Sequence, residues 1–168
     1  MQPLEIDYTI YVASSRERLW EGLTIAGFTR RYWAEEIRSN WRIGAAMEAF
    51  ALDGTLSWHG TVLEYEPPHV LSYTFGGPEA DPPTTRVRFE LTNVDSRDVS
   101  SAPVVRLRLT HDRFGSDEPF FRDCRRAWPE LMSSLKSRWR AVVRWASCMR
   151  NETPARQREE IADYGLVP

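Results

Sequence analysis

The sequence predicts a single α+β domain in which a curved antiparallel sheet wraps around a long C-terminal helix. Three observations support this prediction. Several short segments alternate apolar with polar residues, which is typical of strands that bury one face. A long segment near the C-terminus instead repeats apolar residues every three or four positions, as an amphipathic helix does. The chain has 168 residues, enough for one domain to bury a core without disulfides or metals.

The first elements of the prediction are a strand and two short helices. Residues 4–12 alternate apolar with polar side chains, which indicates a strand. Ser14 and Glu17 have the spacing of a capping box, so we expect Ser14 to cap a helix that Gly27 ends. Residues 28–33 indicate a second short helix or turn.

The predicted sheet continues up to residue 110. Asp53-Gly54 is a strong hairpin signal, and the polar segments 78–83 and 94–103 are typical of exposed loops. Together with the first strand, the segments between these turns give about six or seven strands. The later strands are expected at 45–52, 56–65, 70–75, 85–91 and 104–110.

A long helix is predicted from about residue 117 to 149. Pro129 lies inside its apolar repeat, and a proline there removes a backbone hydrogen bond, so we expect a kink or a fresh helix start. The polar residues 151–168 predict a tail with at most one short helix. We therefore place one domain at 1–150, followed by this tail.

Composition excludes several classes of function. The net charge of -2, from 22 basic and 24 acidic side chains, does not resemble that of a nucleic-acid-binding protein. No apolar run reaches the ~20 residues of a membrane span, and the N-terminus lacks a signal-peptide pattern. Cys124 and Cys148 lie far apart, which favours reduced thiols in a cytoplasmic protein. The sequence shows no metal-ligand spacing, no phosphate-binding loop and no nucleophile elbow. We therefore assign no metal, cofactor or catalytic residue.

Aromatic content is the strongest indication of function. Seven tryptophans are many for this length, and such side chains gather in cores and ligand pockets. They either pack a core or line an apolar pocket between the sheet and the C-terminal helix, where His111, Tyr73 and Thr110 would fix a ligand's orientation. The candidate ligand-binding residues are Trp33, Trp41, Phe50, Trp58, Tyr73, Phe75, Phe89, Leu109, His111, Trp128 and Met132.

Histidines and arginines offer weaker signals. His111 ends an alternating strand on its apolar face, where it is either a general base or a hydrogen-bonded structural side chain. His59 and His69 are expected to face solvent. Four arginines are expected on the outer faces of two strands, as a solvated surface or as a patch for an acidic partner: Arg86, Arg88, Arg106 and Arg108.

Five segments carry a resemblance to a known family: YVASSRERLWEGLT (11–24), YW (32–33), GTVLEYEPPHVLSYTF (60–75), RLRLTHDRF (106–114) and AWPELMSSLKSRW (127–139). In order and spacing they resemble the activator of heat-shock protein 90 ATPase homologue-like family, within the START-like or SRPBCC helix-grip superfamily. The resemblance covers roughly residues 5–145. Ala127 departs from the glycine that family members commonly have before the helix tryptophan, and Pro129 follows that tryptophan.

The resemblance implies a helix-grip fold, which hosts carriers, cyclases and cochaperones alike. Our first interpretation is binding of a small hydrophobic or amphipathic molecule between sheet and helix, without catalysis. Residues 28–33 and the loop near Gly76 would gate this cavity. One alternative is a cochaperone-like interaction module with a chaperone partner, and another is a cyclase- or hydrolase-type enzyme in the same cavity. A homodimer, through a sheet edge or the tail, is left open.

Overall fold

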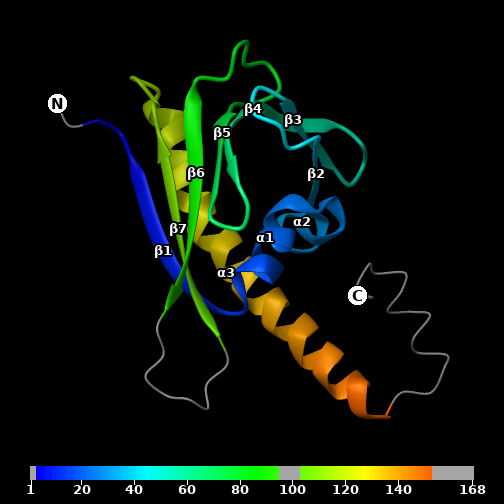
Figure 1. The fold of residues 1–168 in the computed structure, drawn as a ribbon. Helices are drawn as coiled ribbons and strands as arrows, with labels where there is room; N and C mark the ends of the chain where they lie inside the picture. Colours follow the sequence, from blue (N-terminus) through cyan, green and yellow to red (C-terminus); the bar gives the residue numbers. More distant parts are fainter. Residues whose placement is uncertain (1–2, 95–102, 153–168) are drawn as a thin grey trace.

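A seven-stranded antiparallel sheet curves around helix α3 in the computed structural model of the chain, which describes residues 3–94 and 103–152 and, within the last helix, side chains up to residue 138 (Figure 1). The strand order is β1-β7-β6-β5-β4-β3-β2. The elements in chain order are β1 (Ile6–Ala13), α1 (Arg16–Thr24), α2 (Ala26–Trp33), β2 (Glu35–Ser39), β3 (Ala46–Ala51), β4 (Leu56–Glu66), β5 (Val70–Phe75), β6 (Thr85–Val94), β7 (Val104–Asp112) and α3 (Glu118–Glu152).

Alternating residues give the sheet an apolar inner face and a charged outer face. On β6, Val87 and Phe89 are buried toward α3, whereas Arg86 and Arg88 lie on the outer face. The antiparallel register continues this division into β7, where Leu109 stands opposite Phe89. Burying each large apolar side chain contributes roughly 1.5–3 kcal/mol, so the inner face holds the helix in place.

Strand β4 joins the two ends of the sheet and passes close to β5 at Gly60. Residues 56–61 pair with β3, and residues 62–66 pair with β5. A Cβ atom at Gly60 would lie 1.7 Å from the carbonyl oxygen of Thr74, inside any tolerable contact. The close approach of β4 to β5 therefore requires glycine at this position.

The structure corrects three local predictions near the N-terminus. Ser15, not Ser14, caps α1: its Oγ accepts from the Arg18 N–H at 3.3 Å, while the Ser14 hydroxyl donates to the Ser15 carbonyl. Gly27 lies inside α2, and the break between the helices falls at Ile25, whose backbone is extended. Strand β2 was not predicted, because it is short and buries only one side chain.

Helix α3 also differs from its prediction, because it continues through Pro129 without a fresh start. The preceding turn is exposed at Arg125 and Ala127, so water can bond the carbonyl that Pro129 leaves without a partner. The predicted loop at 94–103 falls almost entirely outside the described residues, as does the predicted tail from residue 153 onward. The division into a domain and a tail therefore stays a prediction.

Candidate functional site

Six of the predicted residues form one group of contacting rings between the sheet and α3. We call it the aromatic cluster: Trp33, Trp58, Tyr73, Phe75, Phe89 and Trp128. Ring centroids in contact lie between 4.8 Å (Trp58–Phe75) and 6.3 Å (Tyr73–Phe89) apart. The rings come from α2, three strands and α3, so elements far apart in the sequence meet here. Their tilted and edge-to-face arrangements are those that aromatic pairs prefer.

The aromatic cluster runs from the surface into the interior. Trp33 and Phe75 are half-buried, as is Phe120 on α3, whose ring stacks on Phe75 at 6.0 Å. We call these three residues the rim. Trp58 and Tyr73 lie deeper and are only 4% and 1% exposed. A continuous path of ring contacts therefore leads from solvent to the centre of the sheet's inner face.

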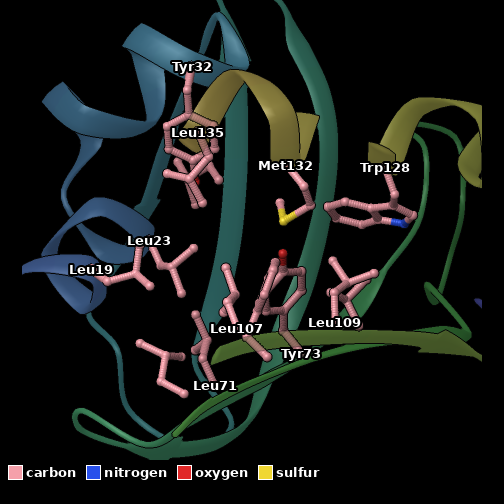
Figure 2. Close-up of a cluster of buried hydrophobic side chains, with 14 of the residues drawn as sticks. Leu19, Leu23, Tyr32, Leu71, Tyr73, Leu107, Leu109, Trp128, Met132 and Leu135 are labelled. Carbon is pink, nitrogen blue, oxygen red and sulfur yellow. The ribbon is translucent and has the colours of Figure 1, made fainter. Parts of the chain in front are cut away.

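The interior behind the rim is filled by the described side chains. Leu109 is completely buried, and Met132 and Leu135 on α3 are 1% exposed. Figure 2 shows Leu109 and Met132 next to Tyr73 and Trp128, and Leu135 next to Tyr32. Side chains covered this completely leave no water-sized space beside them, so a ligand could enter only by displacing some of them.

His111 occupies the middle of a hydrogen-bond chain through the interior. The Trp128 Nε1–H donates to His111 Nδ1 at 3.0 Å, which places the proton of the neutral imidazole on Nε2. His111 Nε2–H then donates to Thr85 Oγ1 at 2.9 Å. Thr85 in turn donates its hydroxyl proton to the carbonyl of Phe75. Every polar atom of this chain has a partner.

The chain keeps His111 neutral and structural. Burial lowers its pKa to about 3, and both ring nitrogens are already engaged, so no lone pair is free to accept a substrate proton. Of the two roles expected for His111, the geometry favours the structural one. Cys124 is equally unsuited to catalysis as a nucleophile, because burial raises the pKa of its thiol to about 12.

Trp58 is held from two directions by residues that flank Ala34. The Glu35 carboxylate accepts the Trp58 Nε1–H at 2.7 Å, and the Trp33 ring lies 5.5 Å from that of Trp58. Ala34 between them adopts the left-handed conformation, with φ of 60°, which ends α2 and turns the chain into β2. Glu35 was not predicted as part of the site, although its place two residues after the YW pair was a usable signal.

Two predicted aromatic residues lie outside the aromatic cluster. Trp41, in the loop after β2, stacks on Tyr65 at 6.0 Å. Phe50 follows the buried Ala49 on β3 and therefore lies on the outer face, under the Arg38 guanidinium, 4.8 Å from ring centroid to Cζ. Thr110, considered as a polar group for the pocket, also lines the outer face.

The outer face carries a ladder of paired charges. Arg86 binds Asp112 through two contacts of 3.0 and 2.5 Å, and Arg88 lies between Glu64 and Glu90. An open hollow of about 470 Å³ lies among these side chains. The carboxylates balance the guanidinium charges there, so this face has the character of a solvated strand surface more than of a patch for an acidic partner. Arg108 extends the ladder by pairing with Asp7, at 2.6 Å.

Two classes of site are absent from the described part of the chain. Within residues 3–94 and 103–152, no three histidine, cysteine, aspartate or glutamate side chains gather in a way that could hold a metal ion. Among the described helices, none has the length and apolar character needed to cross a membrane.

The curved sheet, the two short helices after β1 and the enclosed C-terminal helix define a helix-grip domain. A family model places this domain more narrowly: the chain belongs to the family described as Activator of Hsp90 ATPase homolog 1-like protein, whose model matches residues 13–139. The resemblance noted in the sequence is thereby confirmed. No curated protein matches the chain.

Solved structures share this fold. Protein MLL2253 from Mesorhizobium loti has a TM-score of 0.65 and 21% identity, covering 79% of this chain and 94% of that one. The Aha1 dimer from Colwellia psychrerythraea gives 0.64 and 20%, covering 79% and 92%. PFC0360w, an HSP90 activator from Plasmodium falciparum, gives 0.51 and 19%, covering 64% and 71%. At these identities the likeness extends to the fold alone.

Proposed function

We propose that this protein binds a small hydrophobic or amphipathic molecule between the sheet and α3, without catalysing a reaction. The observation that carries the proposal is the path of aromatic contacts from the half-buried rim, formed by Trp33, Phe75 and Phe120, to the buried Tyr73. An apolar site with a few polar groups is the usual form of a small-molecule pocket.

Entry of a ligand requires local rearrangement, and Met132 is well suited to allow it. Met132 lies above Tyr73 in the centre of the interior (Figure 2). Methionine is unbranched and flexible, so it can change rotamer at small cost. Movement of Met132 and of the rim would exchange contacts between side chains for contacts with the ligand.

Native mass spectrometry of freshly purified protein is the first test, because it detects a ligand that copurifies. A thermal-shift screen against fatty acids, sterols and polyketide-like aromatic compounds follows. A ligand at a hundred times its dissociation constant should add about 2.7 kcal/mol to the free energy of unfolding. The absence of both a copurified molecule and a thermal shift would count against the proposal.

Two tryptophan variants locate the site. Trp33→Ala removes a rim residue, and we expect ligand affinity to fall about tenfold or more. Trp41→Ala is the matched control, since Trp41 is also half-buried and stacked on an aromatic ring, but outside the aromatic cluster. Equal effects of the two substitutions on affinity would contradict a site at the rim.

A second candidate function is interaction with a chaperone in the cytoplasm. The family description and the likeness to an HSP90 activator favour it. It predicts that the purified chain stimulates the ATPase of an Hsp90 protein and copurifies with it. A dimer fits this reading as well, given the likeness to a dimeric Aha1. A pull-down without chaperone and an unchanged ATPase rate would remove this candidate.

A further inference from the structure

Two buried phenols stand out among the polar groups of the interior because their hydroxyls have no hydrogen-bond partner among the described residues. Tyr73 is 1% exposed and Tyr32 is 7% exposed. Figure 2 shows Tyr32 directed from α2 toward Leu135, and Tyr73 directed from β5 toward Met132. Each hydroxyl is therefore able to donate a hydrogen bond to a ligand that reaches it.

Both hydroxyls stay protonated and are therefore hydrogen-bond donors. Burial raises the pKa of Tyr32, and it raises the pKa of Tyr73 well above the usual value. Tyr32 and Glu35 raise the pKa of Tyr73 further, so these three groups lie within electrostatic reach of one another. They come from α2, β2 and β5.

We infer that Tyr73 and Tyr32 form the polar anchor of the binding site, and that the ligand is a flat, neutral molecule with a carbonyl oxygen that accepts from their hydroxyls. This inference rests on the proposed function and specifies its ligand class. A phenol donates to a carbonyl oxygen, and the aromatic cluster supplies stacking surfaces for a planar skeleton. A ligand carbonyl would give these hydroxyls an acceptor that no described residue supplies.

The nearby carboxylate explains why the ligand should be neutral. Glu35 accepts from Trp58 Nε1–H at 2.7 Å, which fixes its orientation beside the aromatic cluster. A carboxylate or phosphate on the ligand would lie near this half-buried carboxylate and be repelled by it. Ketones, quinones and lactones lack such a charge and keep a strong acceptor oxygen.

The test uses matched probes that differ at one atom: aryl methyl ketones and the corresponding isopropenyl arenes, each with one, two or three fused rings. The ketone oxygen is replaced by a methylene group of similar shape. Dissociation constants are measured by quenching of tryptophan fluorescence for the wild type, Tyr73→Phe and Tyr32→Phe. Tyr65→Phe is the control, because Tyr65 packs on Trp20 and Trp41 outside the aromatic cluster.

We expect the wild type to bind the best ketone about tenfold more tightly than its isopropenyl counterpart. This preference should disappear in Tyr73→Phe, Tyr32→Phe or both, while affinity for the hydrocarbon is unchanged, and it should persist in Tyr65→Phe. Equal affinity of the wild type for both members of every pair would overturn the polar anchor and leave the proposed function standing. A preference that survives both substitutions would also overturn it. Binding of no probe would overturn the polar anchor as well, and the ligand screen described above would then decide the proposed function.

Discussion

Two buried polar side chains lie in one row across the sheet and differ in their hydrogen bonds. Tyr73 on β5 stands opposite Val87 on β6, and Val87 stands opposite His111 on β7. His111 is completely buried, with partners on both ring nitrogens. Tyr73 is equally covered, yet its hydroxyl has no partner among the described residues. The row therefore combines a polar group that the fold satisfies with one that it leaves available.

This comparison distinguishes polar groups that stabilise the fold from polar groups that are available to bind a ligand. A satisfied polar chain such as Trp128–His111–Thr85 fixes the position of α3 on the sheet, because breaking any bond leaves a buried donor or acceptor alone. An unpartnered hydroxyl adds nothing to folding and can serve recognition. Removing the polar group of His111 should therefore lower the free energy of unfolding, whereas removing that of Tyr73 should not.

The largest expected effect comes from pH. Because the pKa of His111 falls from 6.5 to about 3 on folding, the unfolded chain takes up a proton first as the pH drops below 6.5. Folding stability is then complete above pH 6.5 and declines by up to about 1.4 kcal/mol per pH unit toward pH 3, for a total of roughly 4–5 kcal/mol. Urea unfolding at a series of pH values measures this loss, compared between the wild type and His111→Leu.

The control for this experiment is His69→Gln, since His69 is exposed and bonds Arg16 at the surface. Its pH dependence should match that of the wild type. If His111→Leu keeps the full decline between pH 6.5 and 4.5, the buried neutral imidazole is not its cause.

His111→Leu itself should lower the free energy of unfolding at pH 7 by about 3 kcal/mol. The substitution leaves the Trp128 Nε1–H and the Thr85 hydroxyl without the imidazole between them. Chemical unfolding monitored by circular dichroism gives the value. A loss below about 1 kcal/mol would mean that the hydrogen-bond chain does not hold α3.

Thr85→Val is expected to have an intermediate effect, a loss of about 2 kcal/mol. It keeps the side-chain volume but removes the acceptor for His111 Nε2–H. The double variant with His111→Leu should lose less than the sum of the two single effects, because both substitutions break the same bond. Additive losses in this double-mutant cycle would contradict the coupling.

Tyr73→Phe should have the smallest effect on the free protein. The hydroxyl has no described partner, so its removal is expected to change the free energy of unfolding by less than about 0.5 kcal/mol or to raise it. Thermal and urea unfolding without added ligand are the measurements. A loss of 1 kcal/mol or more would show that the phenol is structurally required, and the contrast within the row would disappear.

Much of the fold could be predicted because each strand's alternation is a local signal. Strand β5 was predicted with its observed bounds, Val70–Phe75, and the inward direction of Phe89 and His111 follows from period two along their strands. Strand β2 escaped prediction because only Ile37 among its residues is buried. Local alternation says little about so short and polar a segment.

The composition of the site was less predictable, since it depends on loops and on distant contacts. Phe50 follows the buried Ala49, so period two along β3 places it on the outer face, and only its aromatic ring made it a candidate. Trp41 lies in a loop, where alternation has no meaning. The partners of His111 come from β6 and α3, so only the assembled fold reveals that its nitrogens are satisfied.

The change of partner along β4 divides the sheet into two units of unequal protection. One unit contains β2, β3 and the first half of β4, and the other contains the remaining strands. The smaller unit lies at the edge of the sheet and packs on α2, which carries Trp33 of the rim. Amide hydrogens in this unit should therefore exchange with solvent faster than those of β6 and β7, and a bound ligand should slow exchange there first.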